Sequence, residues 1–154
     1  MSRRLWLGAI AAVCAGSMAA ALFAQHRLGM QPCPWCILQR VILCAMALVA
    51  LLGAVVPGLG QRLAVWGLVA LSLCGAAAAL YQNLVAAKSA SCDLTLADRI
   101  ISSLGLDAWL PDVFEVRASC AEAAVSVLGV PFELWSLMLF LALAAIAARL
   151  GRRG

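Results

Sequence analysis

Two cysteines, Cys33 and Cys36, form a C-x-x-C motif at the start of a long apolar run, and Arg40 follows four residues later. We expect the motif at a helix N-terminus, where unpaired backbone N–H groups and the helix dipole stabilise a thiolate. Residues four apart share a helical face, so Arg40 is expected one turn deeper than Cys36. Such a cation would stabilise the sulfur anion and negative charge developing on an electron acceptor. A competing interpretation has Arg40 snorkel up to the lipid headgroups.

The chain has seven cysteines, which separate into two groups. Cys14, Cys44 and Cys74 lie inside apolar runs, where a free thiol packs as a small hydrophobic side chain. Cys92 and Cys120 lie, like the C-x-x-C pair, outside or at the edge of these runs, which indicates redox or metal chemistry. A four-cysteine zinc site is one alternative, but the second pair lacks the short spacing of zinc ligands and zinc leaves Arg40 unexplained. Two inert disulfides in a structural membrane subunit are another.

The composition places these residues in a membrane protein. Of the 154 residues, 66% are hydrophobic and 12% charged, with a mean hydropathy of +1.03, whereas soluble domains have about 45–50% apolar and about 25% charged residues. A helix needs about 20 apolar residues to cross the bilayer. We therefore expect an all-α membrane protein, a four-transmembrane-helix bundle forming a single integral domain over residues 1–154, with spans at approximately 5–24, 37–57, 63–85 and 131–150.

The charges predict the orientation. All seven acidic residues fall between the third and fourth spans or at the mouth of the fourth, and six arginines lie on the opposite side (Arg3, Arg4, Arg62, Arg149, Arg152 and Arg153). The positive-inside rule then makes both termini cytoplasmic, with outward loops at approximately 25–36 and 86–130. A cleaved signal peptide at the N-terminus is an alternative that leaves the following loop outside. The net charge of +4 is scattered, which argues against nucleic acid as a partner.

The second outward loop contains a predicted interfacial helix. Apolar residues at Leu96, Ile100, Ile101 and Leu104 have helical spacing, with Asp98 and Arg99 opposite. Farther along, Trp109, Leu110 and Phe114 are expected to dip into the membrane interface. A loop held at the membrane surface in this way could bring Cys92 or Cys120 close to Cys33.

These features predict an electron relay. A thiolate of an external protein attacks a loop disulfide, exchange passes the electrons to the C-x-x-C pair, and Cys36 delivers them to an acceptor near Arg40. The chain has no flavin or nicotinamide fingerprint, and the single His26 cannot ligate haem in pairs, so a membrane quinone is the simplest acceptor. In an oxidising compartment we expect Cys33 to pair with Cys36 and Cys92 with Cys120 in the resting enzyme.

Three segments carry a resemblance to a known family. They are Pro32-Cys33-Pro34-Trp35-Cys36-Ile37-Leu38-Gln39-Arg40, then Cys92 with its amphipathic loop, then Ser119-Cys120-Ala121-Glu122 leading through Leu128-Gly129 to Trp135-Ser136-Leu137. In this order the sequence resembles the disulfide bond formation protein B family. That family comprises oxidases of the bacterial inner membrane that recharge a soluble periplasmic thiol oxidant. Vitamin K epoxide reductase-like proteins are a second possible relationship, although the early C-x-x-C beside Gln39-Arg40 favours the first.

The resemblance implies a role for each site residue. Cys36 corresponds to the cysteine that contacts the quinone, which is ubiquinone or menaquinone, and Arg40 to the arginine beside its ring. Cys92 corresponds to the cysteine that forms a mixed disulfide with the soluble thioredoxin-like dithiol oxidase. Cys33 and Cys120 correspond to the pair that links the two loops during electron transfer. No metal is implied.

One departure from the family concerns the third helix. Better-known members carry a histidine toward its outer end, where this chain has Ala78-Ala79-Leu80-Tyr81-Gln82. Either Tyr81 or Gln82 could serve as a second quinone donor. Ordinary placement at the level of the headgroups is the favoured interpretation for both.

Overall fold

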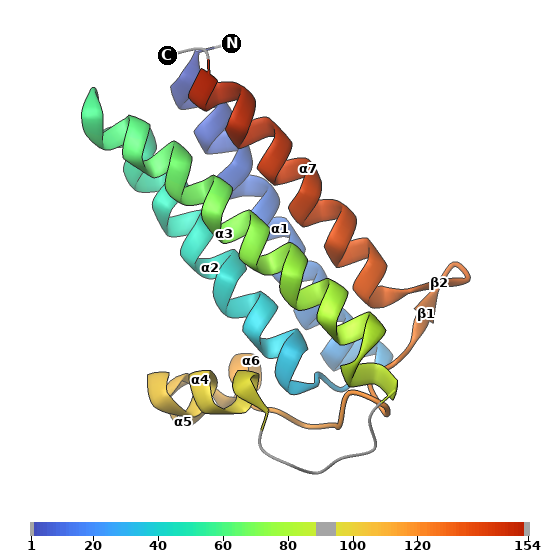
Figure 1. Cartoon of the computed structure of the whole chain (residues 1–154). Helices are drawn as coiled ribbons and strands as arrows, with labels where there is room; N and C mark the ends of the chain where they lie inside the picture. Colours follow the sequence, from blue (N-terminus) through green and yellow to red (C-terminus); the bar gives the residue numbers. More distant parts are fainter. Residues whose placement is uncertain (1, 89–94, 153–154) are drawn as a thin grey trace.

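Four long helices form the body of the protein in the computed structural model, which describes residues 2–88 and 95–152 (Figure 1). They are α1 (Arg3–Leu28), α2 (Pro34–Val55), α3 (Leu59–Leu84) and α7 (Phe132–Arg152). Each is long and apolar enough to cross a membrane. The two termini lie at the same end of the bundle (Figure 1); the opposite end, which carries the two long loops, is here named the loop end.

The ends of these helices follow from local sequence. Helix α1 ends at a left-handed Gly29, with φ of 66°, a conformation that glycine adopts without steric cost. Helix α2 ends at Val55, before the expected boundary at residue 57. The reason is local: Pro57 has no backbone N–H to continue the helix, and Gly58, with φ of 70°, turns the chain into α3. The result is an antiparallel α2–α3 hairpin.

Packing proceeds from one helix to the next: α1 lies against α2, α2 against α3, and α3 against α7. The last contact is close because Gly75 of α3 lies under the ring of Phe140, and a Cβ at position 75 would collide with that ring. Helices α1 and α7 are not packed along their lengths. Near the termini they are joined by a hydrogen bond of 3.3 Å from Arg3 Nη2 to the carbonyl of Leu150.

The second loop folds into three short helices, α4 (Leu96–Leu104), α5 (Leu106–Trp109) and α6 (Pro111–Phe114). The predicted interfacial helix corresponds to α4, which starts at a capping box between Thr95 and Asp98. Trp109 is 77% exposed, as an interfacial anchor requires. The expectation that Phe114 also dips into the interface is wrong: its ring is 6% exposed and packs with Ile37 and Ile101. Phe114 therefore holds the loop onto α2.

Two further features were absent from the sequence-based expectation. A short β-hairpin, β1 (Ser126–Val127) paired with β2 (Val130–Pro131), precedes α7. Its two-residue turn has positive φ at both Leu128 and Gly129, which matches the twist of paired strands. In the spans, Cys14 is buried as expected, but Cys74 is exposed on the outer surface of the bundle and contributes nothing to helix packing.

Candidate functional site

The C-x-x-C motif forms the first turn of α2. Cys33 is the N-cap residue, and its Sγ accepts a hydrogen bond of 3.3 Å from the backbone N–H of Cys36. Pro34 occupies the first helical turn, where a missing N–H costs nothing. The two sulfurs lie 2.8 Å apart, and the Cys33 side chain is completely buried. The motif therefore places two thiols in contact at a helix N-terminus, as the sequence predicts.

Cys120 of the second loop joins this pair. Its side chain is 8% exposed and packs in the same buried cluster as Cys33. Hydrogen bonding to Cys120, then to Cys36, together with burial, raises the pKa of the Cys33 thiol. The hydrogen bond from Cys33 lowers the pKa of Cys120. Of these two thiols, Cys120 is therefore the one that loses its proton more readily.

Backbone contacts hold the two loops in this register. The N–H groups of Arg117 and Ala118 donate to the carbonyl of Pro32, at 3.0 and 3.2 Å. Since Pro32 directly precedes Cys33, this contact positions the second loop against the motif. Of the two loop cysteines expected near Cys33, Cys120 lies there; Cys92 falls outside the described residues.

Arg40 points into the protein. It is 5% exposed, and its Nη1 donates to Oε1 of Gln25 at 2.6 Å and to the carbonyl of Val113 at 2.8 Å. The interpretation in which Arg40 snorkels to the headgroups is therefore wrong. Gln25 in turn donates to the carbonyl of Asp112 at 3.2 Å. Arg40 consequently ties α1, α2 and the α6 segment together at one point.

Two glutamines connect α2 and α3 beside the motif. Gln82 is 2% exposed; its Nε2 donates to Cys36 Sγ at 3.3 Å, and its Oε1 accepts from Gln39 Nε2 at 2.7 Å. Placement of Gln82 at the level of the headgroups is therefore wrong. Tyr81 is 47% exposed and stacks on Trp35, with ring centroids 4.7 Å apart. Of the two candidates on α3, it is Gln82 that reaches the sulfur.

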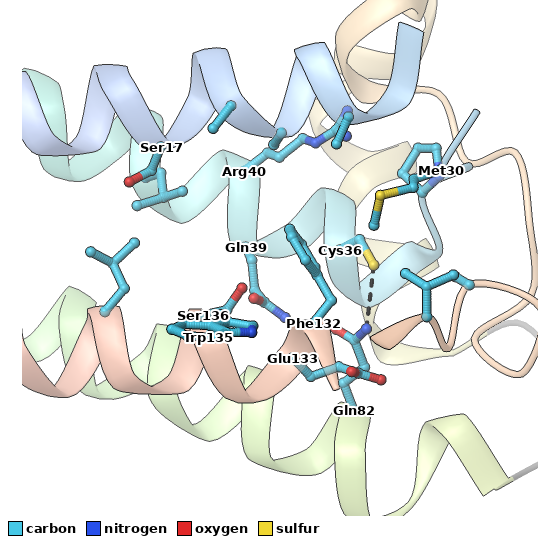
Figure 2. Close-up of a pocket in the computed structure, with 18 of the residues that line it drawn as sticks. Ser17, Met30, Cys36, Gln39, Arg40, Gln82, Phe132, Glu133, Trp135 and Ser136 are labelled. Carbon is cyan, nitrogen blue, oxygen red and sulfur yellow. Dashed lines mark hydrogen bonds between the residues drawn. The ribbon is translucent and has the colours of Figure 1, made fainter. Parts of the chain in front are cut away.

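These side chains line a pocket of about 230 Å³ between α1 and α7 at the loop end (Figure 2). Cys36, Gln39, Arg40 and Gln82 form one polar wall. Small residues of α1 and bulky residues of α7 form much of the rest, among them Ser17, Ala20, Ala21, Ala24, Phe132, Trp135, Leu139 and Phe140. An engineered apolar cavity of about 150 Å³ holds benzene, so the pocket has room for one substituted six-membered ring. A mostly apolar lining with a few polar groups, which include the donors of the α2 and α3 wall, suits a ring that carries carbonyl oxygens.

Sequence reasoning identified Cys36 and Arg40 for this pocket and missed three residues in or beside it, Gln25, Gln39 and Glu133. Gln25 lies just outside the pocket lining and holds Arg40, and Gln39 stands inside the motif quoted for the family. Glu133 is an acid in the first turn of an apolar helix and is 2% exposed. The signal available in each case was a polar residue at the edge of, or within, a run of apolar residues.

Comparisons with known proteins agree with this geometry. The family model described as "Disulfide bond formation protein DsbB" matches residues 2–150. A Disulfide bond formation protein B from Ralstonia nicotianae is 36% identical over 147 residues, covering 93% of this chain and 91% of the relative. Proteins of the same name from Nitrosomonas europaea and Aromatoleum aromaticum are 32% and 35% identical, covering 93% and 95% of this chain and 90% of each relative.

Proposed function

The chain belongs to the disulfide bond formation protein B family and is thus a multi-pass membrane oxidoreductase of disulfide formation; we propose that it passes the electrons to a membrane quinone. The electron donor in this proposal is a soluble periplasmic dithiol oxidase of the thioredoxin-like kind. The membrane is the bacterial inner membrane, with both termini in the cytoplasm. The arginines near the termini and the acids of the second loop support this orientation.

The observation that carries the proposal is the position of Cys36, whose sulfur lines the pocket between α1 and α7. The pocket residues fit a quinone ring. Gln82 can donate to a carbonyl oxygen, and both bonds that Arg40 makes among the described residues come from Nη1, so its remaining N–H groups can serve the ring. The weakly packed side between α1 and α7 would let a long isoprenoid tail remain in lipid. Ubiquinone and menaquinone both satisfy these requirements.

The chemistry of the relay balances. Oxidation of two thiols to a disulfide releases two electrons and two protons, and a quinone takes up both to become a quinol. Cys36 is the thiol at the pocket, and Cys33 connects it to the second loop through Cys120. We propose that Cys92 forms the mixed disulfide with the soluble partner, because attack by a folded protein is easier on a long loop than on the buried Cys33.

The test uses cysteine variants and the soluble partner on non-reducing gels. Cys92→Ser should abolish oxidation of the partner while the Cys33 and Cys36 pair still exchanges electrons with added quinone. Cys120→Ser should accumulate a covalent complex with the oxidised partner, because the Cys92 thiolate opens the disulfide of the partner and the resulting mixed disulfide lacks its neighbouring thiol. A complex that survives Cys92→Ser and disappears in Cys33→Ser would show that the partner attacks the C-x-x-C motif directly, and the assignment of the two loops would be wrong.

The resting disulfides form a separate part of the proposal. Mass mapping of the oxidised enzyme should find Cys33 joined to Cys36 and Cys92 joined to Cys120, and added quinone should regenerate both after reduction. The contact between Cys33 and Cys120 in the structure suits the linked intermediate that forms during turnover. Four free thiols with bound zinc would contradict the redox assignment altogether.

A further inference from the structure

Among the described residues that line the pocket, Glu133 alone carries a carboxyl group. It is 2% exposed, and its Oε2 is a buried atom with no hydrogen-bond partner among the described residues. In Figure 2 its carboxylate lies at the end of the pocket that holds Gln82 and Cys36. A buried charge without a partner is unfavourable by several kcal/mol. Packing alone therefore does not explain a carboxyl group at this position.

The groups around Glu133 define its chemistry. The other titratable or charged groups that line the pocket are Cys36 and Arg40 of α2; in the described chain, α1 and α3 add only neutral side chains such as Gln82, and α7 adds no further charge. Arg40 does not form an ion pair with Glu133 within the described residues. Glu133 therefore shares the pocket with the Cys36 thiol and the Arg40 guanidinium, and its Oε2 is available to exchange a proton.

We propose that Glu133 is the proton-exchanging group of the pocket, an inference that rests on the proposed function. Its Oε2 takes the proton that leaves Cys36 Sγ as the thiolate forms, so that one S–H bond breaks and one O–H bond forms. This proton is then supplied within the pocket to the two-electron acceptor, a quinone, and Glu133 returns to the carboxylate. The proton of Cys33 leaves to water at the loop end, and the second proton taken up by the acceptor comes from the same water.

A second cavity lies beside the pocket. This cavity of about 380 Å³ shares Met30, Gln31, Ala123 and Val125 with the first, and it is also lined by the charged residues Arg117 and Glu122. The two cavities are therefore adjacent at the loop end, and we take the second cavity as the source of this water. Glu133 lies in the first turn of α7, and the N–H of the preceding Phe132 donates to the carbonyl of Val125, which lines both cavities.

The first experiment follows Glu133 itself by infrared spectroscopy in quinone-free protein. Reduction of the C-x-x-C pair at neutral pH should produce the C=O stretching band of a protonated carboxyl group, and chemical oxidation should remove it. The band should be lost in Glu133→Gln, shifted in Glu133→Asp and unchanged in the matched control Asp107→Asn, which removes a carboxyl group of α5 outside the pocket. A reduced wild-type protein without the band would overturn the inference.

The second experiment measures single-turnover reduction of short-chain ubiquinone and of a short-chain menaquinone by pre-reduced protein. Glu133→Gln should lower the rate on the order of 100-fold, the smaller end of the range for general acid–base groups, with KM unchanged and a new decrease of rate as pH rises. Glu133→Asp should recover much of the rate, and Asp107→Asn should match wild type. An unchanged rate and pH profile in Glu133→Gln would refute the role of Glu133. A wild-type protein inactive with both quinones would instead refute the proposed function, while the infrared band would still decide proton binding.

Discussion

Arg40 is expected to have two separable functions, and replacing it by lysine tests both. The guanidinium Nη1 holds Gln25 and the carbonyl of Val113 at the same time, at 2.6 and 2.8 Å. A hydrogen bond to a charged group contributes about 1.5–3 kcal/mol. Together the two bonds of Arg40 contribute about 3–6 kcal/mol, as long as no water molecule takes over either bond when Arg40 is replaced. Arg40→Lys keeps the charge but has no planar fork, so we expect it to retain one bond and lose the other.

The loss should appear first as looser attachment of the second loop. A deficit of about 1.5–3 kcal/mol corresponds to roughly 10–150-fold more frequent opening. Hydrogen exchange of the α6 amides, Val113 and Phe114 above all, should accelerate by that factor in Arg40→Lys and by more in Arg40→Ala. Arg27→Lys is the matched control, because Arg27 lies at the same end of the bundle and is exposed.

The second consequence concerns the pocket. The apparent KM for quinone should rise in Arg40→Ala far more than the free energy of unfolding falls, and Arg40→Lys should be intermediate. Two results would refute this reasoning: unchanged α6 protection in Arg40→Ala would show that the two bonds do not hold the loop, and a normal apparent quinone affinity would remove Arg40 from the ligand site.

Further variants test single contacts. Gln82→Leu leaves the amide of Gln39 buried and unpaired, which should lower the free energy of unfolding by about 1–3 kcal/mol in chemical denaturation. The same variant should slow quinone reduction in single-turnover assays. Gly75→Ala should cost about 1–3 kcal/mol by overpacking the α3–α7 contact, also measured by chemical denaturation. Thr95→Ala removes the cap of α4, so hydrogen exchange of the α4 amides should show a free energy of opening lower by about 1 kcal/mol. Cys33→Ala removes the hydrogen bond that lowers the pKa of Cys120. The pKa of Cys120 should therefore rise, and alkylation of Cys120 should need a higher pH than in the wild type.

The features that the sequence predicts correctly are local ones. A run of apolar residues determines a spanning helix, and Cys33 with Pro34 specifies where α2 begins, because capping depends on neighbours in the chain. Thr95 and Asp98 define the start of α4 in the same way. For these elements the pattern and the structure agree closely, since no distant residue is needed to decide them.

The features that the sequence does not predict depend on distant partners. Arg40 bonds to residues 15 and 73 positions away, and Cys36 accepts from Gln82, which is 46 positions away. Periodicity shows that a polar residue lies in an apolar helix, but the partner that compensates its burial comes from the packing of other helices. For that reason the sequence favours placement of Gln82 at the level of the headgroups, whereas the structure buries its side chain between helices.

The arrangement of the three described site cysteines explains how one small bundle can connect water-soluble and lipid-soluble chemistry. Cys36 faces the pocket, Cys120 belongs to the loop, and Cys33 contacts both sulfurs from its N-cap position. Because the pKa of Cys33 is raised and that of Cys120 is lowered, Cys120 is the better attacking thiolate where the two meet. In the proposed relay a disulfide held by Cys33 would pass between these two neighbours, both of which already contact Cys33.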